Sequence, residues 1–211
     1  AASALARRYE GDNPVLIYLP ETAFDTEQFI RDVEAALEKT PNVIVCISEG
    51  INDGKGTFIC ELSSDVGVDT FGHKMLTGSG KYLENLVKDR LGVKVRSIEL
   101  NVCQRCSSAI LSGTDQKEAI ASGAYGVKCA LEGETGKMVA FRRVPGEDYR
   151  VDYVTEDVNL ICNQEKGVPL EWITEHGSDV GKEFIEYALP LIQGEVKVPV
   201  KDGLPLFAYR K

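Results

Sequence analysis

The sequence has no apolar run long enough to cross a bilayer and no excess of basic residues. A membrane-spanning helix needs about 20 consecutive apolar residues, and no stretch of the 211 residues approaches that length. The 24 lysines and arginines face 33 aspartates and glutamates, which gives a net charge of −9. A chain this acidic repels the phosphate backbone of nucleic acid unless its basic residues cluster tightly. We therefore expect a cytoplasmic protein that binds neither membrane nor nucleic acid.

The chain has only two histidines and its cysteines are dispersed, which argues against a histidine-rich metal site and a disulfide framework. The six cysteines are scattered along the chain, and at this length such scatter is typical of reduced thiols. His73 and His176 lie far apart, and His73 alone is more typical of a structural residue than of a general base. The G-x-S-x-G, H-E-x-x-H and EF-hand patterns are absent, so acyl transfer, metalloprotease and calcium-binding functions have no support.

What the sequence does contain is an alternation of apolar strands and amphipathic helices. Residues 15–19 and 43–47 are continuous apolar runs with the length of buried strands. Between them, Asp25-Thr-Glu-Gln28 has the form of a capping box that opens a helix. This order predicts an α/β fold with a mostly parallel sheet flanked by helices.

The alternation continues through the rest of the chain after a polar, glycine-rich stretch. The predicted elements are a helix over 82–91, a strand over 94–100, a helix from a capping box at 115–118 to 131, a strand over 137–141, a strand over 149–154 and a helix over 179–189.

Glu49 follows directly on the apolar run 43–47, where the carboxyl end of a strand is expected. Open parallel sheets bind ligands just beyond the carboxyl ends of their strands. A carboxylate there, between Ser48 and Gly50, can accept hydrogen bonds from a polyol while the glycine lets the ligand approach. The alternative is a solvated turn carboxylate, and the position alone gives both about equal weight.

Arg96 and Arg105 lie in the predicted strand 94–100 and just beyond its end. Two guanidinium groups near a strand terminus suit a phosphate, because each offers a planar fork of donors. Their spacing alone favours the alternative, in which both arginines pair with the abundant acids of this chain.

Cys103 and Cys106 form a C-x-x-C pattern, which occurs in redox dithiols and in halves of zinc sites. A zinc site needs two further ligands, and no second cysteine pair has that spacing. A thioredoxin-like motif would open a helix directly after its strand, whereas residues 107–114 intervene here. We therefore expect two small buried thiols that pack the loop.

Several motifs, taken in order, resemble the carboxyl half of 6-phosphofructokinases, most closely the pyrophosphate-dependent bacterial kind. These motifs are AASALA (1–6), IYLPE (17–21), ISEG (47–50), DTFGH (69–73), ELNVCQR (99–105), GETGKMVAF (133–141) and EKGVP (165–169) with Trp172. The DTFGH segment, with Gly78-Ser-Gly80, is only loosely similar to a phosphate-binding loop. Together the motifs cover residues 1 to about 195.

The resemblance implies a role in phosphoryl transfer to the 1-hydroxyl of fructose 6-phosphate. Glu49 matches the carboxylate that holds the sugar hydroxyls, and Arg96 matches the arginine that reaches the 6-phosphate, often across a subunit interface. Gln104 and Arg105 form the family's Gln-Arg motif, in which the arginine binds the same phosphate. This chain departs from the family around that motif: Val102 and Cys103 stand where relatives place histidine or tyrosine, and Cys106 and Ser107 replace two glycines.

The family's donor-binding loop, catalytic aspartate and Met-Gly-Arg motif precede the point where this sequence begins. The resemblance therefore implies a fragment without catalytic residues or Mg²⁺ ligands, inactive alone, whose complete enzyme uses Mg²⁺ and either pyrophosphate or, less favoured, ATP. It implies a carboxyl half over 1–145, with a sugar-phosphate-binding part (1–106) and a return segment (107–145), followed by an extension packed on it (146–211).

Without the amino half, the helix from Asp115 and the strand 137–141 would expose apolar faces, so we expect a homo-oligomer. Two alternatives stay open. One is a natural, non-catalytic sugar-phosphate-binding regulatory subunit. The other, weaker, is a redox or zinc protein that uses Cys103 and Cys106.

Overall fold

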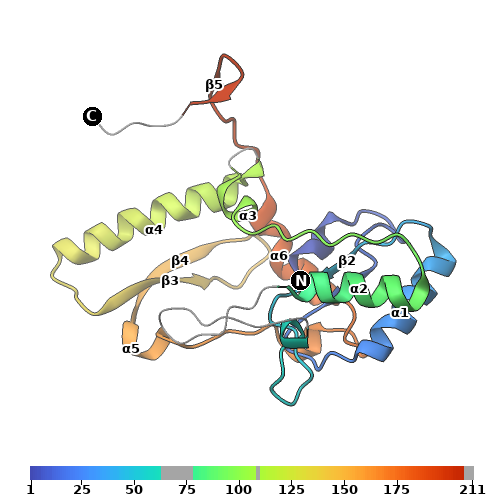
Figure 1. The fold of residues 1–211 in the computed structure, drawn as a ribbon. Helices are drawn as coiled ribbons and strands as arrows, with labels where there is room; N and C mark the ends of the chain where they lie inside the picture. The colour runs from blue at the N-terminus through green and yellow to red at the C-terminus, as the bar shows by residue number, and fades with distance from the viewer. Residues whose placement is uncertain (63–77, 108–109, 207–211) are drawn as a thin grey trace. The chain divides into compact units, whose positions relative to one another are not determined.

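The computed structural model describes residues 1–62, 78–107 and 110–206, and the chain forms two compact units (Figure 1). Unit 1 comprises Ala1–Asn101 and Gly167–Tyr187, and unit 2 comprises Val102–Lys166 and Ala188–Lys211. The DTFGH motif at 69–73 lies outside the described residues. None of the described helices is long and apolar enough to cross a membrane.

Unit 1 is built on a parallel pair of strands and the helix that connects them. Strand β1 (Leu16–Tyr18) pairs with β2 (Val45–Ile47), and α1 (Thr26–Lys39) lies between them in sequence. The helix begins at Asp25, whose carboxylate accepts a hydrogen bond from the Gln28 N–H at 2.8 Å. This hydrogen bond satisfies one of the free N–H groups at the helix start and confirms the predicted cap.

The core of unit 1 forms where α1 and α2 (Ser79–Leu91) pack with β1. From α1 and α2 come Phe29, Ile30, Val33, Leu83 and Val87. Strand β1, two loops and the 3-10 helix that begins at Ile59 contribute Leu16, Tyr18, Phe24, Ile51 and Ile59. The aromatic rings of Tyr18 and Phe24 meet edge to face, with centroids 5.1 Å apart. The other elements of this unit are the 3-10 helices η1 (Ala2–Ala6), η2 (Ile59–Leu62) and η4 (Leu170–Trp172), and most of α6 (Lys182–Ala188).

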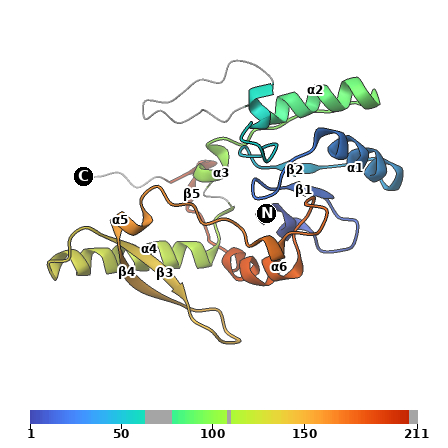
Figure 2. The same cartoon turned by 90° about the horizontal axis from the view of Figure 1, so that it is seen from below.

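Unit 2 consists of a long helix that packs on an antiparallel hairpin. Helix α4 (Gly113–Leu131) runs beside β3 (Lys137–Arg143) and β4 (Val151–Asp157), as Figures 1 and 2 both show. The Tyr125 ring of α4 lies 6.2 Å from the Tyr153 ring of β4. The remaining elements are α3 (Cys103–Cys106), α5 (Val158–Ile161), η5 (Leu189–Ile192), β5 (Val200–Lys201) and β6 (Leu204–Pro205).

Helix α4 exists as predicted, but its cap is Ser112 and not Asp115. The Ser112 hydroxyl accepts a hydrogen bond from the Asp115 N–H at 3.0 Å and donates to the Leu191 carbonyl at 2.6 Å. The helix start also lies close to Gly194, because the Gly113 N–H donates to the Gly194 carbonyl at 2.8 Å. A Cβ at Gly113 would come within 3.3 Å of that backbone, so this close approach favours glycine.

The fold is α/β, as predicted, but the strands that the structure describes do not form one mostly parallel sheet. The described strands form three two-stranded sheets, of which β1–β2 is parallel, whereas β3–β4 and β5–β6 are antiparallel. A parallel connection needs a crossover of about a dozen residues or more. Only residues 144–150 join β3 to β4, so that pair has to form a hairpin.

Residues 94–100 are not a strand, although their apolar and polar residues alternate. The Ser97 N–H, which a neighbouring strand would accept, donates instead to the Glu84 carboxylate of α2 at 2.8 Å. Val93 and Val95 still pack against the core of unit 1, while Arg96 is exposed. The alternation of apolar and polar residues over 94–100 therefore indicates which side chains face the core. It does not indicate that a partner strand is present.

One face of α4 is apolar and exposed, as expected from the sequence. Ile120, Val127 and Leu131 are 68%, 62% and 84% exposed. The opposite face packs on the hairpin, where Cys129 is buried and Gly126 faces Val139. A helix that is apolar on both faces is typical of a buried environment.

Candidate functional site

Glu49 lies just past the carboxyl end of β2, where the sequence placed it. The Ser48 N–H donates to the Tyr18 carbonyl at 3.2 Å, so the parallel pairing continues to this point. Glu49 is exposed, and its carboxylate forms no hydrogen bond with any residue that the structure describes. Its backbone carbonyl accepts from the Ser79 hydroxyl at 3.5 Å, which ties the turn to the start of α2. Among the described residues, no donor occupies this carboxylate.

Arg96 lies on an extended segment that Glu84 fastens to α2. The Glu84 carboxylate accepts from the Lys81 ammonium at 2.6 Å and from the Ser97 hydroxyl at 2.6 Å. The Lys81 hydrogen bond, followed by those from Ser97, lowers the pKa of Glu84 to about 2. With Ser97 held in this way, the neighbouring Arg96 side chain is directed to the exposed side.

Gln104 and Arg105 form the middle of α3, a single helical turn in unit 2. The N–H groups of Arg105 and Cys106 both donate to the Val102 carbonyl, each at 3.0 Å. All four residues of α3 are exposed. The Gln-Arg pair is therefore presented on a short turn that depends on few interactions.

Other arginines of this chain form ion pairs with acids, so it is informative whether Arg96 and Arg105 do the same. Arg7 forms a two-pronged pair with Asp179 at 2.7 and 2.6 Å, and the Asp179 hydrogen bond raises the pKa of Arg7. In contrast, neither Arg96 nor Arg105 forms an ion pair with an acid in the described part of the chain. The alternative that both are neutralised by nearby acids has no support among these residues. Glu49 and Arg96 belong to unit 1, and Gln104 and Arg105 to unit 2.

Comparison with known proteins gives the family. No family model matches the chain. The pyrophosphate–fructose 6-phosphate 1-phosphotransferase of Halomonas elongata is 34% identical over 208 residues, which cover 99% of this chain and 49% of that protein. The protein of the same name from Methylococcus capsulatus is 35% identical over 97% of this chain and 48% of its own length. The crystal structure of a pyrophosphate-dependent phosphofructokinase from Marinobacter aquaeolei superposes with a TM-score of 0.80 at 30% identity, over 98% of this chain and 47% of that one.

The chain belongs to the phosphofructokinase family. It spans about half the length of the relatives it matches, and that half is the carboxyl one. The family resemblance and the phosphofructokinase fold that the motifs implied are therefore confirmed.

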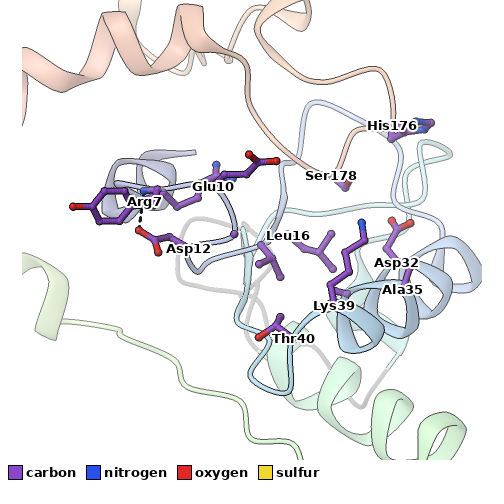
Figure 3. Close-up of a pocket in the computed structure, with 14 residues that line it drawn as sticks. Arg7, Glu10, Asp12, Leu16, Asp32, Ala35, Lys39, Thr40, His176 and Ser178 are labelled. Carbon is purple, nitrogen blue, oxygen red and sulfur yellow. Dashed lines mark hydrogen bonds between the residues drawn. The ribbon is translucent and has the colours of Figure 1, made fainter.

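This phosphofructokinase homologue also has a pocket that the sequence did not indicate. The pocket has a volume of about 670 Å³ and lies in unit 1, between the turn before β1 and the outer side of α1 (Figure 3). Arg7, Asp12, Asp32, Lys39 and His176 are among its lining residues. No short motif could have revealed it, because its walls come from segments far apart in the sequence.

The pocket is a different place from the candidate site. It borders Leu16 at the amino end of β1, whereas Glu49 follows the carboxyl end of β2, and the two strands are parallel. None of the four predicted contact residues lines it. Two of its acids are already bonded: Asp12 accepts from the N–H groups of Arg8 and Tyr9, which lower its pKa, and Asp32 accepts from the Tyr18 hydroxyl.

The expectation of buried thiols at Cys103 and Cys106 is wrong for this phosphofructokinase homologue. Both are exposed, because they begin and end the one-turn helix α3, in which no residue is buried. No group of three His, Cys, Asp or Glu side chains in the described ranges could hold a metal ion. The zinc alternative therefore gains no further ligand from these residues.

Proposed function

We propose that this chain supplies fructose 6-phosphate contacts to a 6-phosphofructokinase that uses pyrophosphate, or less favourably ATP, as phosphoryl donor. The observation that carries the proposal is the similarity over 97–99% of the chain to proteins named for this reaction. The reaction transfers a phosphoryl group to the 1-hydroxyl of fructose 6-phosphate. Because the chain matches only about half of those relatives, the activity belongs to a larger whole.

The proposed contacts have the chemistry that a sugar phosphate needs. Arg96 and Arg105 carry planar forks of N–H donors, which suit a phosphate dianion, and their lack of acid partners in the described chain leaves those donors free. Glu49 accepts hydrogen bonds from sugar hydroxyls, and the Gln104 amide both donates and accepts. These four residues orient the sugar and neutralise its phosphate, a contribution to positioning and not to bond breaking.

The chain's own described residues do not fit a magnesium site, since they contain no cluster of three metal-ligating side chains. We place Mg²⁺, the catalytic base and the donor-binding loop in the part of the complete enzyme that corresponds to the unmatched half of the relatives. The isolated chain is then inactive. Turnover of fructose 6-phosphate by the pure chain would contradict this assignment.

The partners follow from the same proposal. The exposed apolar face of α4, formed by Ile120, Val127 and Leu131, is covered in the working protein by the amino half or by a second copy of the chain. The chain works in the cytoplasm, as part of glycolysis, and requires neither nucleic acid nor membrane.

Isothermal titration of fructose 6-phosphate into the purified chain tests the proposal. We expect binding, and we expect Arg105→Ala to weaken it by about tenfold or more, because a hydrogen bond to a charged group contributes about 1.5–3 kcal/mol. The matched control is Arg142→Ala, which removes another exposed arginine of unit 2 and should leave the affinity unchanged. Equal affinity of the parent chain and Arg105→Ala would contradict the assigned contact.

The regulatory-subunit alternative predicts the same binding, so a different observation separates it. A start codon directly upstream of Ala1 in the source gene would favour a natural non-catalytic subunit. A long upstream coding region that encodes the donor loop would favour the enzyme.

A further inference from the structure

Two exposed thiols flank the Gln-Arg pair. Cys103 and Cys106 begin and end α3, and Gln104 and Arg105 lie between them. Cys162 is also exposed, but no other cysteine lies within one helical turn of it in the sequence. In the described residues, the pair in α3 is therefore the one place where two accessible thiols lie a single turn apart.

The spacing of the two thiols is close to that of a disulfide without matching it. Residues three apart on a helix have Cβ atoms about 5–6 Å apart, whereas a disulfide needs about 3.5–4.5 Å. Closing a bond across α3 thus requires the Cβ atoms of Cys103 and Cys106 to approach by roughly 1–2 Å. A four-residue helix can provide that movement only by changing its backbone angles.

Little in the described structure resists such a change. Only the Val102 carbonyl accepts the hydrogen bonds of the Arg105 and Cys106 N–H groups, and no side chain caps the helix. No residue from 101 to 107 is buried, so the turn is not fixed by packing. Segments with exposed hydrogen bonds and few buried contacts rearrange at low free-energy cost.

We propose that Cys103 and Cys106 form a reversible dithiol–disulfide modification site that responds to low-molecular-weight disulfides and changes the conformation of the Gln104–Arg105 segment. One thiolate attacks a sulfur of oxidised glutathione and releases one molecule of reduced glutathione. The second thiolate attacks the resulting mixed disulfide and releases the second molecule. The protein loses two protons and two electrons, and oxidised glutathione takes up both to become two molecules of reduced glutathione.

The disulfide closes a covalent ring that includes the backbone of Gln104 and Arg105, and this restricts the conformation of both residues. Where Arg105 is the phosphate contact, which rests on the proposed function, oxidation weakens the binding of fructose 6-phosphate.

Peptide mapping by mass spectrometry tests the chemistry on the full chain, reduced and then incubated with oxidised glutathione. We expect the peptide with Cys103 and Cys106 to lose two hydrogen atoms, to carry no glutathione and to return to the dithiol with dithiothreitol. Cys162 serves as the internal control, since it should carry a single glutathione. The Cys106→Ser variant should carry glutathione on Cys103. Separate glutathiones on Cys103 and Cys106 of the parent, or no reaction there while Cys162 reacts, would overturn the site.

Limited trypsin digestion tests the change in conformation without any ligand. Cleavage after Arg105 should become several-fold slower on oxidation, relative to cleavage after Lys166 in an exposed loop of the same unit. The Cys106→Ser variant should show no such change. Equal relative rates in the reduced and oxidised parent would overturn the conformational part of the proposal.

Titration of fructose 6-phosphate into both forms separates this inference from the proposed function. We expect the oxidised chain to bind about tenfold more weakly or worse, corresponding to loss of one charge-assisted contact. Unchanged affinity would overturn the coupling to Arg105. No binding by the reduced chain would count against the proposed function, while mapping and digestion would still decide the dithiol site.

Discussion

Unit 1 has a dense core, whereas unit 2 is nearly all surface. Every buried apolar residue of the described chain belongs to unit 1, except Cys129 and Ala188. In unit 2 even the long helix α4 has one apolar face packed on a hairpin and the other exposed. Because buried apolar area is the main source of folding free energy, most of the stabilising burial of the described chain lies in unit 1. Among the described residues, unit 2 buries little such area.

The same contrast separates the two segments that carry the candidate arginines. In unit 1, the segment around Arg96 is held by Val93 and Val95 against the core and by the bonds from Ser97 to Glu84. In unit 2, α3 presents Arg105 on a single turn with no buried residue. The first arginine is therefore positioned in advance, whereas the second sits on a segment that a ligand, a partner or a disulfide can reshape.

Truncating a core side chain of unit 1 and an exposed apolar side chain of unit 2 should give the largest contrast. Phe29→Ala removes a ring that is 3% exposed, so it should lower the free energy of unfolding by about 3–5 kcal/mol. At a protein concentration low enough to keep the chain monomeric, Ile120→Ala on the exposed face of α4 should change it by less than about 0.5 kcal/mol. Urea denaturation at equal protein concentration measures both. Similar losses for the two variants would mean that the α4 face is already buried in solution.

Introducing a charge on the exposed face of α4 tests whether this face is a contact surface. We expect the parent chain to self-associate at tens of micromolar, and Val127→Lys to weaken that association by about tenfold or more, because a lysine ammonium is costly to bury in an apolar contact. Lys128→Gln, on the neighbouring position, is the control and should leave association unchanged. Light scattering measures the oligomeric state. A monomeric parent would show that the chain does not cover this face by itself.

Sequence reasoning succeeded where the signal was local. The cap at Asp25 and the place of Glu49 at a strand end both depend on a few adjacent residues. It failed where the outcome depended on distant partners. Residues 94–100 have the alternation of a strand, but Glu84 takes the Ser97 N–H, and the pocket beside β1 is assembled from three distant segments. The exposed thiols of α3 were missed because a C-x-x-C pattern does not state whether its turn is covered.

The smallest expected effect concerns the bond that fixes the segment of Arg96. Hydrogen bonds from Lys81 and Ser97 lower the pKa of Glu84 from its ordinary value near 4.5 to about 2. A carboxylate with a lowered pKa in the folded state stabilises the protein fully above its unfolded pKa, and this contribution is lost as the pH falls. The stability that Glu84 contributes should therefore be complete above about pH 4.5 and disappear as the pH approaches 2.

Glu84→Gln removes the titrating group and keeps an oxygen that can accept from Ser97. We expect this variant to be less stable than the parent at pH 7, and the difference should shrink between pH 4.5 and 2. Glu34→Gln is the control, since Glu34 is exposed on α1 and its carboxylate has no hydrogen-bond partner among the described residues. Urea midpoints across this pH range measure the difference. A gap between parent and Glu84→Gln that stays constant with pH would show that the carboxylate charge does not hold the segment, and the position of Arg96 would then rest on the packing of Val93 and Val95.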